Sequence, residues 1–508
     1  MLKNFKKTIP YIVFFIATLI SYLLFLVYYD STTGLDFSSK YFTYLNHFIF
    51  GNPLEVKDGQ GIIYYFLISL VGKYNIKLLG PNNFNEVFNN IVQFGNLILT
   101  VLFFVGLYKY LLLLQINKNK IFYVFSVINF FPPLIYLRLT FKAEILALAL
   151  FPWLLYIYNK IKLNKNLYLK IFFIIIFSII LTIKPSISMM VLVSFLFIEK
   201  ETIIKNYKLI IFSFIGSLIL FKFNNDYVGL SFNSFDVTGT RWDNRVNLKF
   251  FLTFDLKKFV TEPLFNNLSD SFLSILLLDT FSDYFRFFWK HQEQTNYLAF
   301  NSINISNNFH ISNYLRDYIA IFLSFGMYLM FIINYKIKEF EFKRIFLLPF
   351  IGIFTLITSA AGIPVNNFDP NTADTFKVHY FSFLLVISFA FLLLTSNIKV
   401  YYHLFLIPIF VFIMGFPKAN QNDLIIDLTR KYNLSEVCLI NLSNNSCRNV
   451  FEITCSTIDF YNMYDTNKVN IYYAYPDPIK LSKNKDIVYA RNRNECYTYY
   501  DNGYRYKY

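Results

Sequence analysis

A dense group of charged and aromatic residues occupies the stretch LDTFSDYFRFFWKH at 278–291. Asp279 and Asp283 are four residues apart and therefore share one face of a helix. Trp289 follows them and offers a ring on which a sugar could stack. The group is a candidate contact for a sugar or an acceptor. The favoured interpretation is an aromatic belt at a membrane interface whose charges neutralise one another.

Signatures of soluble enzymes do not occur in the sequence. It contains no Walker loop, no GxGxxG motif opening a helix, no GxSxG and no HExxH. The five histidines show no paired metal-ligand spacing. The lack of a nucleotide-binding motif argues against an ATP-driven pump.

The composition indicates that lipid surrounds much of the chain. The 508 residues are 56% hydrophobic and 16% charged, whereas soluble domains are about a quarter charged. Apolar runs alternate with short basic loops, so the net charge of +15 is spread along the chain and forms no compact patch with stacking aromatics. This distribution argues against nucleic-acid binding and predicts an all-α polytopic protein in the lipid bilayer.

Long apolar runs predict about eleven transmembrane helices, because a helix of about 20 residues spans the hydrocarbon. The first run is too long for a cleavable signal peptide, so we expect it to stay as an anchor. The membrane domain covers 1–416, with large outside loops at 30–90 and 223–316 that are expected to carry interfacial helices, one of them at 61–72. The predicted spans are 8–29, 92–114, 121–138, 144–159, 167–183, 186–199, 209–222, 317–334, 345–361, 381–396 and 399–416.

Basic loops predict the orientation of these spans. Lys3, Lys6 and Lys7 place the N-terminus in the cytoplasm by the positive-inside rule. An odd number of spans then puts the C-terminus outside, and the low-GC character of the composition favours a bacterial inner membrane with a periplasmic C-terminus. The loops expected on the cytoplasmic side contain Lys118, Lys120, Lys160, Lys162, Lys165, Lys200, Lys205, Lys208, Lys336, Lys338, Lys343 and Arg344.

The C-terminal region, 417–508, is predicted to be a small extracytoplasmic α/β domain. IIDLTRKY predicts a helix, VCLINL, KVNIYYAY and DIVYA predict strands, and Asn502-Gly503 predicts a terminal hairpin. The even number and clustering of its cysteines predict two disulfides in an oxidising compartment. Metal binding or free thiols are the alternatives, although the spacing lacks the CxxC pairs of zinc sites. The cysteines are Cys438, Cys447, Cys455 and Cys496.

The stretch after the first predicted span resembles a known family. It combines an acidic residue near the membrane, an aromatic segment and a Gly-rich turn, carried by Asp36-Phe37, Tyr41, Tyr44, Gly51 and Tyr64-Tyr65. In these residues and in overall topology the sequence resembles the GT-C superfamily of integral-membrane glycosyltransferases, which use polyprenyl-phosphate sugars and include the protein mannosyltransferases. The resemblance covers roughly the first 200 residues, and its motifs are short.

The resemblance implies that Asp36 is the general base. It would deprotonate an acceptor hydroxyl or amine that attacks the anomeric carbon, with inversion and departure of polyprenyl phosphate. The alternatives are that Asp36 caps a helix starting at Phe37, or that Asp30 or Asp58 is the base. Tyr64 is a candidate contact to the acceptor or sugar.

A departing phosphate requires cations on the same face of the membrane. Lys377 and His379 resemble the basic-residue-then-tyrosine pattern with which family members enter a late span. This chain has Lys and His where Arg is usual, so a bidentate grip on phosphate is in doubt. The alternative is that the cations extend toward lipid headgroups. The candidates at predicted outer boundaries are Arg138 and Lys142, with Glu144 nearby, and Lys184, Lys377 and His379.

These observations together predict an inverting glycosyltransferase that moves a sugar from a polyprenyl-phosphate donor to an envelope lipid, glycan or protein. No cofactor is required by the sequence, although Asp279 and Asp283 could hold the divalent metal ion that some relatives use. A transporter or flippase of lipid-linked saccharides is the alternative, disfavoured because the spans are nearly free of charge away from their ends. A polymerase or ligase is a further alternative, supported by Arg241 and Arg245.

Overall fold

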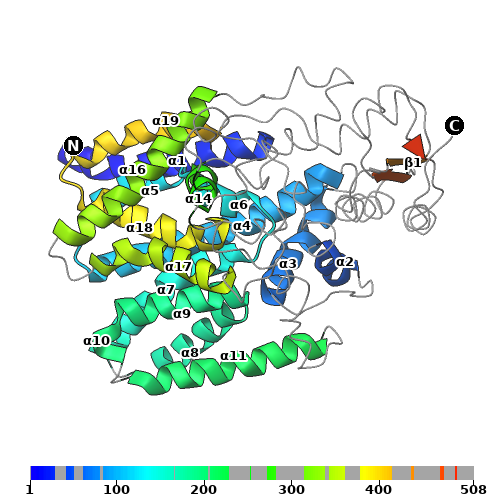
Figure 1. The fold of residues 1–508 in the computed structure, drawn as a ribbon, viewed down its shortest axis with the longest axis horizontal. Coiled ribbons are helices and arrows are strands. Elements are labelled where there is room, and N and C mark those ends of the chain that lie inside the picture. The colour runs from blue at the N-terminus through cyan, green and yellow to red at the C-terminus, as the bar shows by residue number, and fades with distance from the viewer. Residues whose placement is uncertain are drawn as a thin grey trace.

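The computed structural model is mostly helical in the part of the chain that it describes (Figure 1). That part comprises residues 2–28, 42–50, 61–79, 84–164, 166–203, 206–227, 252, 254, 272–281, 314–337, 343–360, 378–414, 436–439, 470–473 and 487–488. The helices of the first half are α1 (Leu2–Tyr28), α2 (Phe42–Phe50), α3 (Ile62–Leu79), α4 (Phe84–Leu113), α5 (Lys118–Ile128), α6 (Pro132–Leu139), α7 (Glu144–Leu163), α8 (Leu167–Leu181), α9 (Pro185–Ile198), α10 (Lys200–Ile203) and α11 (Tyr207–Tyr227).

The second half continues the bundle, and each of the eleven predicted spans coincides with helix. Four described helices are long and apolar enough to cross a membrane, and α5 with α6 would make a fifth. Further apolar helices are shorter, so the count of eleven crossings stays a prediction. The helices of the second half are α14 (Phe272–Phe281), α16 (Tyr314–Ile337), η6 (Lys343–Leu347), α17 (Leu348–Ala360), η8 (Val378–Phe381), α18 (Ser382–Thr395), η9 (Val400–Phe405) and α19 (Leu406–Met414).

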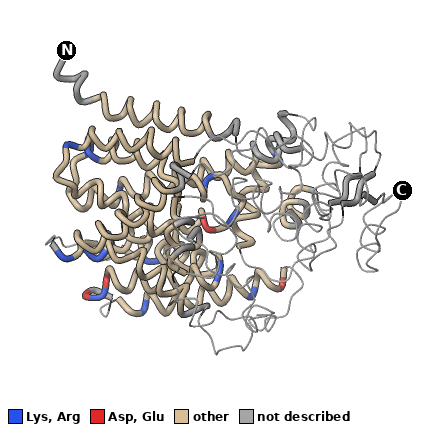
Figure 2. Tube along the Cα trace, turned by 45° about the horizontal axis from the view of Figure 1, so that its top comes forward, with Lys and Arg blue, Asp and Glu red and all other residues tan. Residues whose placement is uncertain are grey.

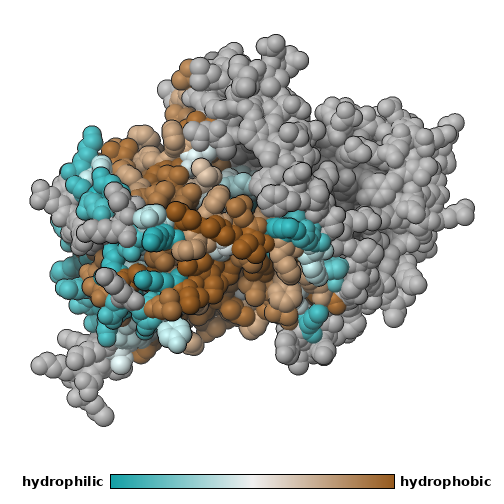
Figure 3. Space-filling model, turned by 90° about the horizontal axis from the view of Figure 1, so that it is seen from below, coloured by the Kyte–Doolittle hydropathy of each residue, from teal (hydrophilic) through white to brown (hydrophobic). Residues whose placement is uncertain are grey.

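The surface of the bundle is apolar where water would require polar side chains. Figure 3 shows a broad hydrophobic surface with hydrophilic residues on either side of it. On α11, Phe212 and Ile219 are more than half exposed, and Phe172 of the neighbouring α8 is half exposed. Large apolar side chains exposed in this number are typical of helices in lipid. The membrane assignment therefore rests on the folded surface as well as on composition.

One end of the bundle, here called the basic end, gathers the lysine-rich loops (Figure 2). There Lys120 donates to the Ser396 carbonyl at the end of α18. Arg344 of η6 donates to the Ile198 carbonyl at the end of α9 and pairs with Glu201. Loops that the sequence predicts on one side of a membrane thus lie together, while the orientation of that side stays a prediction.

The predicted helix over 121–138 is broken in the structure. α5 and α6 meet at a bend of 66°, because Pro132 and Pro133 can begin a helix but cannot continue one. The Asn129 amide at the break donates to Thr18 of α1, and the Asn129 carbonyl accepts from Ser21. Aromatic rings fill the other side of the break, from Phe131, Phe281, Phe389 and Phe410.

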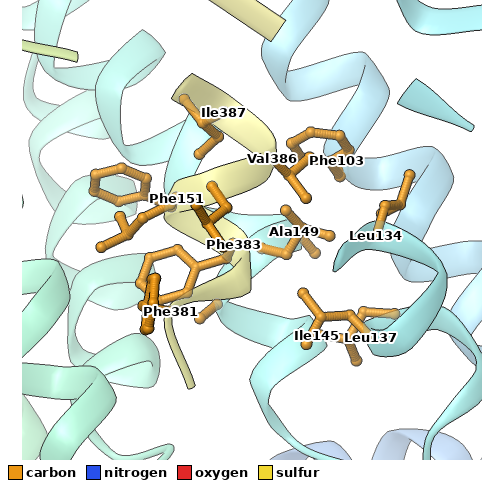
Figure 4. Close-up of a cluster of buried hydrophobic side chains, with 14 of the residues drawn as sticks. Phe103, Leu134, Leu137, Ile145, Ala149, Phe151, Phe381, Phe383, Val386 and Ile387 are labelled. Atoms are coloured by element: carbon orange, nitrogen blue, oxygen red, sulfur yellow. The ribbon is translucent and has the colours of Figure 1, made fainter. Parts of the chain in front are cut away.

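The core of the bundle lies between α4, α6, α7 and α18. Figure 4 shows side chains of these four helices pointing toward one another, and all of them are buried. The labelled members include Phe103, Leu134, Leu137, Ile145, Ala149, Phe151, Phe383, Val386 and Ile387. This packing holds the first turns of α7 and α18 in fixed positions.

A glycine allows α4 to approach α7 closely. A Cβ atom on Gly106 would lie 2.6 Å from the Trp153 ring, whose Nε1 donates to the Leu102 carbonyl. We expect Gly106→Ala to lower the free energy of unfolding by about 1–3 kcal/mol through overpacking. Thermal unfolding in detergent would measure this. Gly326→Ala is the matched control, because nothing lies within 4 Å of its added Cβ, and an equal loss in both variants would contradict the packing argument.

Three short strands are described in the C-terminal region; β2 and β3 lie within predicted strand ranges, and β1 begins one residue before its predicted range. β1 (Glu436–Leu439) pairs in parallel with β2 (Asn470–Tyr473) and antiparallel with β3 (Ile487–Val488). The helix and hairpin predicted for this region lie outside the described residues, and so do Cys447, Cys455 and Cys496. Cys438 lies in β1, but its side chain is not described. The α/β domain and its disulfides stay predictions.

Candidate functional site

An ion pair and an aromatic ring join the beginnings of three helical segments. Lys184 Nζ lies 3.2 Å from Glu144 Oε1 and 4.2 Å from the centroid of the Tyr380 ring. We call these residues the Lys184 triad. Lys184 is the N-cap of α9, Glu144 is the first residue of α7, and Tyr380 precedes α18 in η8. Pro185 favours the extended conformation of Lys184 and begins the helix directly after it.

A second triad of the same residue types lies at the other end of α7. Lys162 Nζ is 2.7 Å from Glu199 Oε2 and 5.4 Å from the centroid of the Tyr158 ring. The lysine and glutamate side chains are 26% and 5% exposed, against 20% and 2% in the Lys184 triad. This Lys162 triad belongs to the basic end. The two triads are separated by most of α7, or about 27 Å, which is close to the thickness of a bilayer's hydrocarbon core.

Helix dipoles distinguish the two triads. The charges on α7 suit its dipole, because Glu144 stands at its positive end and Lys162 at its negative end. The charges on α9 oppose its dipole, because Lys184 stands at its positive end and Glu199 at its negative end. The start of α9 therefore concentrates positive charge around Lys184, whereas the Lys162 triad lies at two negative helix ends. A site for an anion needs the first arrangement.

α3 and α4 contribute a buried polar network beside the Lys184 triad. The Tyr64 hydroxyl donates to Asn96 Oδ1 at 2.9 Å, and the Asn96 amide donates to the carbonyls of Arg138 and Thr140. Lys142, which is 5% exposed, lies in the short link that these bonds hold between α6 and α7. Asn96 thus fixes the segment that carries Lys142 and leads into Glu144.

Gly61 brings the start of α3 against the same segment. Its φ of +70° suits glycine, and its nitrogen donates to the Thr182 carbonyl, two residues before Lys184. An added Cβ would lie 2.9 Å from Ala143 Cβ. The first turn of α3, with Tyr64, is therefore held between the segments that carry Lys142 and Lys184.

The Asn96 network predicts that Asn96→Ala lowers the free energy of unfolding more than Tyr64→Phe does. Asn96→Ala removes the hydrogen bonds that Asn96 makes to two buried carbonyls and to the Tyr64 hydroxyl, and we expect a loss of about 2–4 kcal/mol in the free energy of unfolding. Tyr64→Phe removes only one of these bonds and is expected to lose about 1 kcal/mol. Thermal unfolding of both purified variants tests the order. A larger loss for Tyr64→Phe would contradict the assignment of Asn96 as the centre of the network.

Arg138 makes a structural contact that the sequence did not predict. Its Nη1 donates to Ser21 Oγ and its Nη2 to the Ser21 carbonyl, both at 3.0 Å, and the residue is 1% exposed. These bonds connect α6 to α1 just beyond the α5–α6 break. Phosphate binding by Arg138 stays a prediction, but two of its donors serve helix packing in the structure.

Several predicted site residues lie outside the described part of the chain. His379 lies in η8 and Asp279 in α14, but neither side chain is described. Tyr380 follows His379 directly, so η8 brings this stretch of chain to the Lys184 triad. Among the described residues, no group of three or more His, Cys, Asp and Glu is suited to hold a metal ion. The residues outside are Asp36, Lys377, Asp283 and Trp289.

Two members of the site were not predicted as site residues. Asn96 is a polar residue within the mostly apolar predicted span 92–114, which is a recognisable signal for a buried contact. Tyr380 lies close to a predicted boundary, yet its position over Lys184 depends on a contact across nearly 200 residues. No protein-family model and no curated protein matches the chain. The site is therefore interpreted from its own chemistry.

Proposed function

We propose that the chain is a membrane glycosyltransferase that moves a sugar from a polyprenyl-phosphate carrier to an envelope acceptor on the non-cytoplasmic face. The observation that carries the proposal is Lys184, a cation placed at the positive end of α9 with the start of α7 beside it. Glu144 supplies one counter-charge at 3.2 Å, and the positive ends of α7 and α9 add positive potential that can attract a further anion. A lipid phosphate is the anion that this membrane setting would offer.

The proposed reaction uses Asp36 as the base and Lys142 and Lys184 as the cations that stabilise the leaving phosphate. The acceptor oxygen or nitrogen attacks the anomeric carbon, and Asp36 takes its proton. The bond from the anomeric carbon to the phosphate oxygen breaks, and polyprenyl phosphate leaves with the bonding electrons. The two lysines neutralise the charge that grows on this oxygen. Lys184 is one-fifth exposed and can reach a ligand, whereas Lys142 adds charge from a buried position.

Release of the carrier tests the proposal directly. The purified chain in lipid vesicles would be given a labelled polyprenyl-phosphate sugar together with membrane extract as the source of acceptor. We expect free polyprenyl phosphate to appear together with a glycosylated acceptor. A chain that binds the donor but never releases polyprenyl phosphate, with any sugar tried, would contradict the enzymatic function.

Transport of a lipid-linked saccharide is the second candidate, and the α5–α6 break favours it. Broken helices in membranes are typical of transporters. In this chain aromatic rings and Asn129 fill the break, so helix packing accounts for it. Vesicles loaded with a fluorescent polyprenyl-phosphate sugar distinguish the candidates, because a transporter moves the lipid between leaflets without consuming it.

A further inference from the structure

Glu144 is an unexpected residue in a site for an anion. Its carboxylate is 2% exposed and contacts Lys184, the cation that the proposed function assigns to the lipid phosphate. A carboxylate in this position occupies Lys184 and repels the phosphate, so it lowers affinity for any anion. Its contact with Lys184 also holds α7 to α9, but an uncharged glutamine could make the same hydrogen bond. The negative charge itself therefore needs an explanation.

The two lipids that the proposed reaction handles differ in charge. The donor is a phosphodiester with one negative charge, whereas the product is a phosphomonoester that carries close to two at neutral pH. Coulomb energies are proportional to the charge of the ligand. Repulsion by Glu144 therefore acts about twice as strongly, in free energy, on the product as on the donor.

We propose that Glu144 lowers the affinity of the Lys184 site for a doubly charged lipid phosphomonoester more than for a singly charged lipid phosphodiester, and so removes most of the preference for the phosphomonoester that cations alone would give. This inference rests on the proposed function and adds a specificity-determining role for one residue. With Glu144 present, the attraction to Lys184 and the helix ends is largely cancelled, so the product leaves readily. Without its charge, the product binds tightly and inhibits the next turnover.

The matched pair of triads gives the experiment its control. Glu144→Gln removes the charge at the proposed site, and Glu199→Gln removes the corresponding charge in the Lys162 triad. The burial of the two carboxylates is nearly the same. Dissociation constants would be measured in nanodiscs for undecaprenyl phosphate and for its methyl ester, a phosphodiester of the same lipid. These probes differ in charge and in one methyl group.

We expect Glu144→Gln to tighten binding of the methyl ester about tenfold and of undecaprenyl phosphate about a hundredfold. Doubling the charge of the ligand doubles the Coulomb free energy and therefore squares the ratio of the dissociation constants. Glu199→Gln should change neither constant. An equal factor for both lipids, no change with Glu144→Gln, or the same change with Glu199→Gln would overturn the inference while leaving phosphate binding intact. If neither lipid binds the unmodified chain, the proposed function fails as well.

The unmodified chain provides a second test that needs no variant. Its site should bind the methyl ester and undecaprenyl phosphate within about threefold of each other, because Glu144 cancels most of the attraction to the cations. A site made of cations alone would prefer the phosphomonoester, so a preference of about tenfold for undecaprenyl phosphate in the unmodified chain would also overturn the inference.

Discussion

Lys184→Met is expected to weaken binding of undecaprenyl phosphate by about 30-fold, or about 2 kcal/mol, because it removes a charge-assisted contact to the phosphate. Methionine keeps the length and apolar character of the stem but removes the ammonium group. Binding in nanodiscs is the measurement, since it does not depend on knowing the sugar or the acceptor.

Lys162→Met is the control for this prediction. Both variants leave a buried glutamate without its lysine, Glu199 in Lys162→Met and Glu144 in Lys184→Met, and Glu199 keeps its hydrogen bond from Asn159. Only Lys184→Met should weaken phosphate binding. Equal weakening in both variants would mean that the effect comes from loosening of α7 against α9, and Lys184 would lose its assignment as a phosphate contact.

Asp36→Asn is expected to lower turnover by about 100- to 10,000-fold, the range that a general base contributes. The dissociation constant of the donor should stay within about threefold, because the base contacts the acceptor and not the phosphate. Turnover is measured as release of polyprenyl phosphate from a labelled donor.

Asp30→Asn and Asp58→Asn are the comparison variants, since the same region of sequence offers all three carboxylates. Asp36 is assigned correctly if its variant alone loses turnover on this scale. Full activity in Asp36→Asn together with a large loss in one of the others would move the base to that residue.

The elements of the bundle could be predicted because their signals are local. Each apolar run predicts its own helix, and the helices occur where the runs lie. Pro132 and Pro133 also carry a local signal, and the predicted helix over 121–138 overlooked it. The three strands could likewise be predicted from short runs rich in β-branched and aromatic residues.

The contacts of the site could be predicted only in part. The boundary positions of Lys142 and Lys184 are visible in the sequence, because charged residues stand out beside apolar runs. The pairing of Lys184 with Glu144 and Tyr380 depends on how α7, α9 and η8 pack, and no periodicity encodes that. For the same reason the hydrogen bond from the Arg138 guanidinium to Ser21 of α1 could not be predicted.

Photolabelling of the unmodified chain would show whether a lipid phosphate binds at the Lys184 triad. The probe is undecaprenyl phosphate with a diazirine on the isoprene unit next to the phosphate, and labelled residues are mapped by mass spectrometry. We predict labelling near the start of α9 and around Tyr380, which excess undecaprenyl phosphate suppresses. Labelling around Lys162 and Tyr158 that excess undecaprenyl phosphate suppresses equally well would contradict binding at the Lys184 triad.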